Sequence, residues 1–220
     1  MGFRPWDRNP SFCGRCMGKL SDRGIGGAEI EISMLFADIR GSTSLAETMT
    51  ASEFAKVLDR FYASATDVLL REDAMVDKFV GDEVVALFIP AFAGSRHAEH
   101  AISSAANLLS ATGHGDGDGP WVPVGAGVHT GMAYVGAVGS EGKVTDVTAL
   151  GDAVNTTARL ASAAEAGEIL VTAAAAEAAG LQADGVELRS LTLKGKAEPV
   201  NVYSLRTGDR IMERLQGQRS

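Results

Sequence analysis

Short apolar runs along this chain predict strands, and the turn residues between them predict how the strands connect. Residues 29–39 carry a continuous apolar run that stops at Asp38, which is typical of a buried strand that ends in a turn. Residues 74–80 and 83–89 form two further runs, separated by Gly81-Asp82. Because glycine adopts the backbone angles of a tight turn, this pattern predicts a hairpin with the acid at its tip.

Two stretches show helical spacing. Thr50-Ala-Ser-Glu53 is a capping box, and apolar residues recur after it every three or four positions as far as Leu70, which predicts a long helix with a core-facing stripe. A second helix is expected over about 95–110. Its histidines, His97 and His100, fall on a mostly polar face, so we expect them to be solvated rather than to act as ligands.

The C-terminal half predicts further strands and helices. Residues 121–138 alternate apolar and small side chains, and we expect a second hairpin with its turn at Thr130-Gly131. Residues 145–150 are expected to lead into a helix over 152–164, and a second helix is expected over 173–179. Strands are expected at 168–172, 186–191 and 200–205. The order strand–helix–strand–strand–helix–strand matches a ferredoxin-like arrangement. We therefore expect an α/β chain of the α+β type, with a βαββαβ ferredoxin-like core, extra C-terminal strands and helices, and a mainly antiparallel sheet.

Composition narrows the class of protein. At 220 residues the chain is long enough for one well-buried domain, expected over 29–206, between an irregular N-terminal arm (1–28) and a polar tail (207–220). The net charge of −8 and the lack of a long Lys/Arg run disfavour binding to nucleic acid. No apolar stretch approaches the length of a membrane span, so we expect no membrane segment in this chain and a cytoplasmic location.

The two cysteines lie together as Cys13-Gly-Arg-Cys16 on the expected arm. This spacing fits half of a zinc site that a second chain completes, or a redox pair. It also fits two reduced thiols with no ligand, and the lack of a second cysteine pair favours this last interpretation.

Candidate chemistry gathers where the first strand ends. Asp38 is followed by Gly41-Ser42-Thr43, a turn leading into a helix, and the backbone N–H groups at such a helix start are an anion site. An acid at this place would repel phosphate unless a divalent cation lay between them. Asp38 and Asp82 are expected on neighbouring strand ends, and two carboxylates with phosphate oxygens suit Mg²⁺. Taken singly, each acid is more often a turn former or a helix cap.

Five segments together resemble one known family. They are Phe36-Ala-Asp38-Ile-Arg-Gly41, Lys78-Phe-Val-Gly-Asp82, His129-Thr-Gly131, Gly151-Asp-Ala-Val-Asn155-Thr-Thr-Ala-Arg159 and Leu193-Lys194-Gly-Lys196. In order and spacing they look like the motifs of class III nucleotidyl cyclase catalytic domains, over roughly 29–205. The domain expected at 29–206 would then be the catalytic domain.

The resemblance implies a metal and phosphate site. Two Mg²⁺ or Mn²⁺ ions would be held by Asp38 and Asp82, with the carbonyl of Ile39 helping. One ion would lower the pKa of the ribose 3′-hydroxyl for attack on the α-phosphorus, and the other would hold the β- and γ-phosphates. The backbone N–H groups of Arg40, Gly41, Ser42 and Thr43 would cradle the triphosphate.

The resemblance also implies three polar residues beyond the metal site. Asn155 and Arg159 are four apart, so they share one helix face. Asn155 would orient the ribose, and Arg159 would stabilise charge on the α-phosphate in the transition state. Lys194 would reach the terminal phosphates, although its spacing fits an ordinary turn lysine nearly as well.

Two positions bear on the choice of base. Lys78 can donate to adenine N1, whereas the same nitrogen of guanine carries a proton, so ATP is favoured over GTP. The family's usual Asp partner is replaced here by Thr148, whose hydroxyl can still accept from the adenine amino group. A second departure is Gly125, which stands where some relatives carry a phosphate-contacting Arg.

The expected function is therefore adenylate cyclase activity, which converts ATP to 3′,5′-cyclic AMP and pyrophosphate. In the family the metal-binding acids come from one chain and the other groups from its partner, which implies a head-to-tail homodimer with two equivalent sites. The alternative is a catalytically silent cyclase-homology domain that acts as a nucleotide-binding sensor or regulatory module. Cyclisation of GTP is disfavoured by Lys78.

Overall fold

The computed structural model describes residues 4–6, 9–14, 27–139, 145–183, 185–196, 198–209 and 211–212. Its strands are β1 (Pro5–Trp6), β2 (Asn9–Cys13), β3 (Gly27–Ile39), β4 (Met75–Val80), β5 (Glu83–Phe88), β6 (Val124–Gly139), β7 (Thr145–Leu150), β8 (Glu168–Thr172), β9 (Glu187–Leu191) and β10 (Val200–Arg206). Its helices are α2 (Ser42–Glu47), α3 (Ala51–Leu70), α4 (Pro90–Ala93), η1 (Gly94–Arg96), α5 (His97–Ala111), α6 (Asp152–Ala163) and α7 (Ala173–Ala178).

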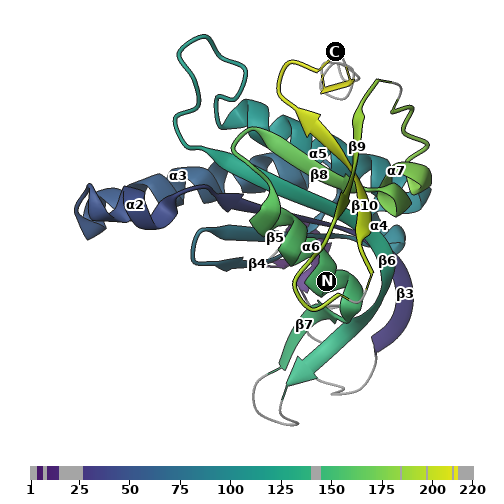
Figure 1. Cartoon of the computed structure of the whole chain (residues 1–220). Helices are drawn as coiled ribbons and strands as arrows, with labels where there is room; N and C mark the ends of the chain where they lie inside the picture. The colour runs from purple at the N-terminus through teal and green to yellow at the C-terminus, as the bar shows by residue number, and fades with distance from the viewer. Residues whose placement is uncertain are drawn as a thin grey trace.

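One eight-stranded sheet organises the domain (Figure 1). Its strands follow the order β4-β5-β3-β6-β8-β10-β9, and β7 pairs with β6 beside this path. The first four strands pair antiparallel in the order of a ferredoxin-like βαββαβ core, with α3 and α5 as its helices. Only β6 and β8 pair in parallel among the described strands. The expected α+β fold with a mainly antiparallel sheet is confirmed.

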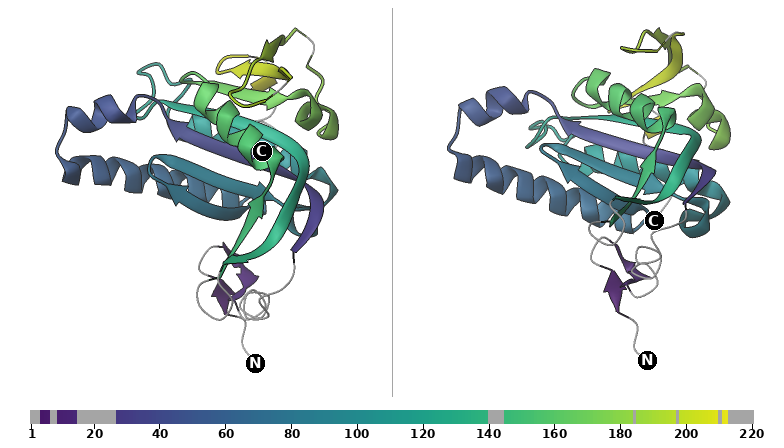
Figure 2. Two further views of the ribbon diagram at one scale, coloured as in Figure 1. Left: turned by 60° about the horizontal axis from the view of Figure 1, so that its bottom comes forward. Right: turned by 90° about the horizontal axis from the view of Figure 1, so that it is seen from below.

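Helices cover both faces of the sheet (Figure 2). Side chains of β3 alternate between the two sides, because successive residues of a strand point to opposite faces. Leu35 and Ala37 pack into a core with α3, α5 and α7, whereas Met34 and Phe36 pack into a second core with β7 and α6. Burial on both faces explains why this strand reads as a continuous apolar run rather than an alternating one.

The capping box before α3 forms as expected. The N–H of Glu53 donates to the Thr50 hydroxyl at 3.3 Å, and the N–H of Thr50 donates to the Glu53 carboxylate at 2.8 Å. Only the C-terminal half of the apolar stripe is fully buried, through Phe61, Ala65 and Leu69. The first half extends past the sheet with α2, at the left of Figure 1.

The hairpin expected within 121–138 is wrong. β6 runs without a turn through Thr130-Gly131, and Gly131 pairs with Ile32 of β3. The glycine permits close packing, since a Cβ atom there would lie 2.9 Å from His129 Nε2 and 3.3 Å from the Ala153 Cβ. Residue 131 is therefore a glycine because α6 approaches the sheet closely here, and not because the chain turns. The antiparallel partner of this region is β7.

The expectation that His97 and His100 are solvated is also wrong. His97 is buried, and its Nδ1 lies 2.9 Å from the Ser33 hydroxyl. Burial lowers the pKa of His97, which favours the neutral ring. His100 Nδ1 lies 2.9 Å from the buried carboxylate of Glu72. Both rings therefore serve the packing of α5.

The N-terminal arm contains more structure than expected, because β1 and β2 pair as a small antiparallel sheet with Cys13 at its end. Cys16 lies outside the described residues, so the zinc, redox and thiol interpretations stay open predictions. Within the described part of the chain, no helix is both long and apolar enough to cross a membrane.

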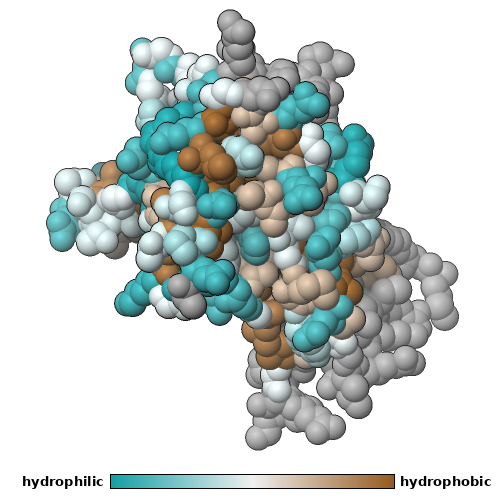
Figure 3. Space-filling view, turned by 45° about the vertical axis from the view of Figure 1, so that its right-hand side comes forward, coloured by the Kyte–Doolittle hydropathy of each residue, from teal (hydrophilic) through white to brown (hydrophobic). Residues whose placement is uncertain are grey.

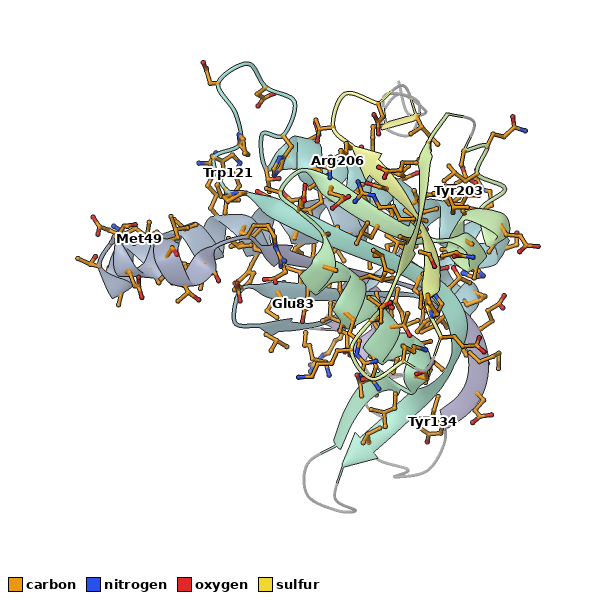
Figure 4. All side chains as sticks on the ribbon, in the orientation of Figure 1. Met49, Glu83, Trp121, Tyr134, Tyr203 and Arg206 are labelled. Atoms are coloured by element: carbon orange, nitrogen blue, oxygen red, sulfur yellow. The ribbon has the colours of Figure 1, made fainter. Side chains whose placement is uncertain are left out.

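A buried acid links the C-terminal strands. Glu168 is 1% exposed, and its carboxylate lies 2.9 Å from Arg189 Nη1 and 3.2 Å from Arg206 Nη2. The same group accepts from the Ser204 hydroxyl and from the N–H of Glu165. Figure 4 labels Arg206 at the end of β10. Strands β8, β9 and β10 therefore meet around one carboxylate.

Glu168→Gln should destabilise the fold by about 2–3 kcal/mol, because two arginines lose a shared charged acceptor. Urea unfolding followed by circular dichroism measures the change. Glu187→Gln is the matched control, since Glu187 pairs with the same Arg189 on the surface. Equal, small effects of the two variants would contradict a special role for the buried acid.

Candidate active site

The first cluster of polar residues lies where β3 meets the β4–β5 turn. Asp38 stands opposite Glu83 of β5, and the Ile39 N–H donates to the backbone carbonyl of Asp82 at 3.3 Å. The carboxyl group of Asp82 lies near enough to Asp38 to raise the pKa of Asp38. The structure therefore brings together the two acids that the sequence singled out.

Burial and neighbouring charges raise the pKa of two carboxyl groups in this cluster, Asp38 and Glu83. The pKa of Asp38 is raised to about 6, chiefly by burial and further by Asp82, while Arg40 opposes the shift. The pKa of Glu83 is raised to about 7 by burial and by the charges of Asp38 and Asp82. Glu83, labelled in Figure 4, was not singled out from the sequence, although it directly follows Asp82 at the start of β5. A crowded group of acids is typical of a site that binds a cation.

The donor set fits a divalent metal ion. Asp38 Oδ1 is buried and has no hydrogen-bond partner, so a buried anionic oxygen faces the site with a vacant lone pair. Within the described ranges, no group of three or more Asp, Glu, His or Cys side chains is placed to hold a metal. The remaining ligands must therefore come from a carbonyl such as that of Ile39, from water and from phosphate, a set that suits Mg²⁺.

Arg40 behaves differently from the sequence expectation. Its backbone N–H donates to the Pro123 carbonyl at 2.8 Å, so it is not free to bind phosphate. Its guanidinium contacts the Asp38 carboxylate and donates to the Ser162 carbonyl at 3.0 Å. The predicted role of the Arg40 N–H in cradling a triphosphate is therefore wrong, because this group donates to the loop that precedes β6.

The other cradle residues keep the expected geometry. Gly41 has φ +69° and ends the turn before α2, a conformation that non-glycine residues rarely adopt. The first N–H groups of a helix lack intrahelical acceptors, and no side chain caps α2. The N–H groups around Ser42 and Thr43 are thus the ones suited to an anion.

Tyr62 of α3 supports the turn that carries Asp82. Its hydroxyl donates to the Gly81 carbonyl, and its ring stacks on Phe79 with a centroid distance of 4.3 Å. Sequence reasoning missed this role, because Tyr62 lies beside an apolar stripe and no pattern marks a helix residue that contacts a hairpin tip.

The second cluster joins Lys78 to Thr148. Lys78 Nζ donates to the Thr148 hydroxyl at 3.1 Å, across 70 positions of sequence. Asp77 completes the cluster, since its carboxylate accepts from Thr148 at 2.8 Å and pairs with Lys78 Nζ at 3.1 Å. The two residues expected to read the base are therefore adjacent within one chain, and Asp77 is an addition that the sequence did not reveal.

The third cluster lies on α6 and the turn after β9. Asn155 is exposed and Arg159 is half-buried. The guanidinium of Arg159 lies over Gly195, where a Cβ atom would be 3.2 Å from Nη2. Lys194 is exposed on the same turn, and its neighbour Lys196 pairs with Asp152. In the described part of the chain, no hydrogen bond or ion pair given by the structure joins this cluster to Asp38 or Asp82.

Comparison with known families identifies the domain. Residues 28–207 match the model of the adenylate and guanylate cyclase catalytic domain. The chain belongs to this family.

Two curated relatives are adenylate cyclases. The chain is 32% identical over 192 residues to the terminal-differentiation-specific adenylate cyclase of Dictyostelium discoideum, covering 84% of this chain and 9% of that protein. It is 28% identical to the adenylate cyclase of Anabaena cylindrica, covering 80% of this chain and 36% of that protein. The cyclase domain thus spans about a third or less of the length of these curated relatives.

Solved structures share the fold over nearly their whole length. The guanylyl cyclase Cya2 aligns with a TM-score of 0.72 and 29% identity, covering 84% of this chain and 97% of that one. The adenylyl cyclase CyaB from P. aeruginosa aligns with a TM-score of 0.71 and 27% identity, covering 84% and 98%. Fold similarity therefore does not separate the two substrates.

The fold of the cyclase domain explains Gly125. It pairs with Asp38 across β3 and β6, and a Cβ atom there would lie 2.8 Å from the Glu165 carbonyl oxygen and 2.9 Å from that of Ala164. Because the backbone after α6 passes directly over this position, no side chain fits without moving that loop. An arginine at Gly125 would require a different path for the chain.

Proposed function

We propose that this domain is an adenylate cyclase that converts ATP to 3′,5′-cyclic AMP and pyrophosphate. The observation that carries the proposal is the meeting of Asp38 and Asp82 at adjacent strand ends, with a buried, unpartnered carboxylate oxygen. When bound there, divalent metal ions supply Lewis-acid stabilisation of the attacking oxygen and of the departing pyrophosphate.

The chain's own residues do the positioning. Asp38 and Asp82 hold the cations, and the N–H groups of Gly41, Ser42 and Thr43 receive the phosphates. Asn155 orients the ribose, Arg159 offsets charge on the α-phosphate, and Lys194 contacts the terminal phosphates. In-line attack then needs little covalent chemistry from the protein, because the rate depends on alignment and on fixed positive charge.

The proposed assembly is a head-to-tail homodimer. Its support is that no hydrogen bond or ion pair among the described residues joins the third cluster to Asp38 or Asp82, as expected if a partner chain supplies one of the two groups. Large apolar side chains are exposed near the base cluster, including Met132 of β6 (58%) and Leu150 of β7 (46%). Figure 3 shows apolar side chains breaking up a polar surface on one face of the molecule. Exposed apolar area of this kind favours a protein partner.

One observation favours the sensor alternative. Arg40 contacts Asp38, so a fixed cation already neutralises one of the two metal-binding acids. A domain in which this pair persisted would bind nucleotide weakly with metal and turn it over slowly. Catalysis would require the Arg40 guanidinium to leave Asp38, so that the carboxylate could hold a metal ion.

Incubation with ATP or GTP plus Mn²⁺, followed by chromatographic identification of the product, separates these functions. We expect cyclic AMP from ATP and little cyclic GMP. Binding of nucleotide without a cyclic product from the dimer would support the sensor, and preferred cyclisation of GTP would contradict the assignment of the base.

Metal affinity should depend on pH in the range of these raised pKa values. The pKa of Asp38 is about 6 and that of Glu83 about 7, so both are largely deprotonated only above pH 7. Lowering the pH from 8 to 5 protonates them, and Mn²⁺ affinity should fall by about tenfold per unit below pH 6. Calorimetric titration at each pH measures this. A flat profile would contradict a site built on these acids.

A further inference from the structure

Asp77 is a buried carboxylate beside the two residues expected to read the base, and the mechanism above gives it no task. It is 4% exposed, and Thr148 is 6% exposed. The Thr148 hydroxyl donates to Asp77 at 2.8 Å, and Lys78 Nζ lies 3.1 Å from both the Asp77 carboxylate and the Thr148 oxygen. All three groups come from β4 and β7 of one chain.

A β-bulge makes this arrangement possible. In a regular strand, Asp77 and Lys78 would point to opposite faces of the sheet. Here Val76 pairs with Ala86 and Lys78 with Val85, so Asp77 has no opposite residue in β5. The extra residue changes the direction in which the following side chains point, an effect that is common for bulges beside functional sites. Two consecutive side chains can then reach the same hydroxyl.

The contacts fix where the Thr148 proton lies. An ionised carboxylate can only accept hydrogen bonds, and an ammonium group can only donate. Thr148 must therefore donate its hydroxyl hydrogen bond to Asp77, while its oxygen accepts a hydrogen bond from Lys78. Its remaining lone pair makes it an acceptor toward any ligand. Lys78 donates two of its three N–H groups to Asp77 and Thr148, so one N–H group is left to donate to the ligand.

We propose that Asp77 is a specificity-determining positioning residue, which holds the Thr148 hydroxyl as an acceptor and so selects adenine over guanine nucleotides. This inference rests on the proposed function. Adenine presents an amino donor at position 6, whereas guanine presents the O6 acceptor there. An acceptor-only hydroxyl pairs with the first and repels the second. A threonine without Asp77 could rotate and donate to O6.

A role as a simple counter-ion for Lys78 explains less of the geometry. The Lys78 side chain is 39% exposed, so water can solvate its charge without a buried partner. The Thr148 hydroxyl is the buried group whose orientation depends on Asp77. Burying a carboxylate costs free energy. Since the bulge in β4 brings this carboxylate to the Thr148 hydroxyl, Asp77 serves to orient that hydroxyl.

The test compares affinities for 3′-deoxy-ATP and 3′-deoxy-GTP, which lack the attacking hydroxyl, in the presence of Mn²⁺. Asp77→Asn should lower the preference for the adenine analogue by about tenfold to a hundredfold, the range for one hydrogen bond to a charged group. In a Thr148→Val background, Asp77→Asn should cause no further change in this ratio, because the hydroxyl it acts through is gone. The ratio of kcat/KM for ATP and GTP should move in the same way.

Glu168→Gln is the matched control, since it also replaces a buried carboxylate by an amide, and it should leave the ratio unchanged. Equal weakening of both analogues by Asp77→Asn would overturn the proposal, as would a change in ratio that persists in the Thr148→Val background. Wild-type protein that binds the analogues but makes no cyclic product contradicts the proposed function alone, and the binding ratio still decides on Asp77. Wild-type protein that binds neither analogue contradicts both.

Discussion

Asp82→Asn should reduce cyclic AMP formation by about a thousandfold or more while the domain stays folded. The variant keeps the shape of the side chain but removes one of the two charges that hold the metal ions, whose loss costs several kcal/mol of transition-state stabilisation. Its backbone carbonyl, which accepts from the Ile39 N–H, is unchanged. Product formation with saturating Mn²⁺ and ATP measures the effect.

The fold of this variant should be at least as stable as wild type without metal, because Asp82 raises the pKa of Asp38 and of Glu83 by repulsion. Asp67→Asn is the matched control, since Asp67 is an exposed acid on α3 and should be replaceable without loss of activity. Activity retained in Asp82→Asn would remove the metal assignment, whatever happens to stability.

Much of the fold was readable because its signals are local. The Gly81-Asp82 turn, the Thr50 capping box and the buried run before Asp38 each depend on a few adjacent residues, and each element formed where expected. The ferredoxin-like order then follows from the sequence of strands and helices. Pairing of β3 with β5 brought Asp38 and Asp82 together without any further information.

Features that depend on distant parts of the chain were not readable. Gly131 looked like a turn residue, but it is small because His129 and Ala153 crowd it. Gly125 is small because the backbone after α6 passes over it. A glycine required by tertiary packing and one required by a turn look the same in sequence.

In the candidate site, too, local features could be predicted from the sequence and features that depend on tertiary contacts could not. Lys78 and Thr148 were paired by resemblance, but Asp77 was invisible, because strand alternation places it on the opposite face from Lys78. Only the bulge in β4 reverses that expectation. Arg40 was assigned through its backbone, yet the β3 end uses that N–H and directs the side chain to Asp38. The sequence therefore marked candidate residues, and the register of the strands decided which of their atoms are available.

Two inactive variants should restore activity when mixed, if each site is shared between two chains. Asp38→Ala removes a metal ligand from one half-site, and Arg159→Ala removes the transition-state cation from the other. A mixed dimer of these chains carries one site with both defects and one with neither. Random exchange of equal amounts yields about half mixed dimers, so about a quarter of wild-type activity should return.

Refolding the two variants together, with separate tags to purify the mixed dimer, makes the measurement direct. Purified mixed dimer should then show about half of wild-type activity, because one of its two sites is intact. Mixing Asp38→Ala with Asp82→Asn is the control: both defects lie in the same half-site, so every shared site keeps one of them and no activity should return. Verified mixed dimers of Asp38→Ala and Arg159→Ala that stay inactive would contradict the shared site. The three clusters would then have to converge within a single chain.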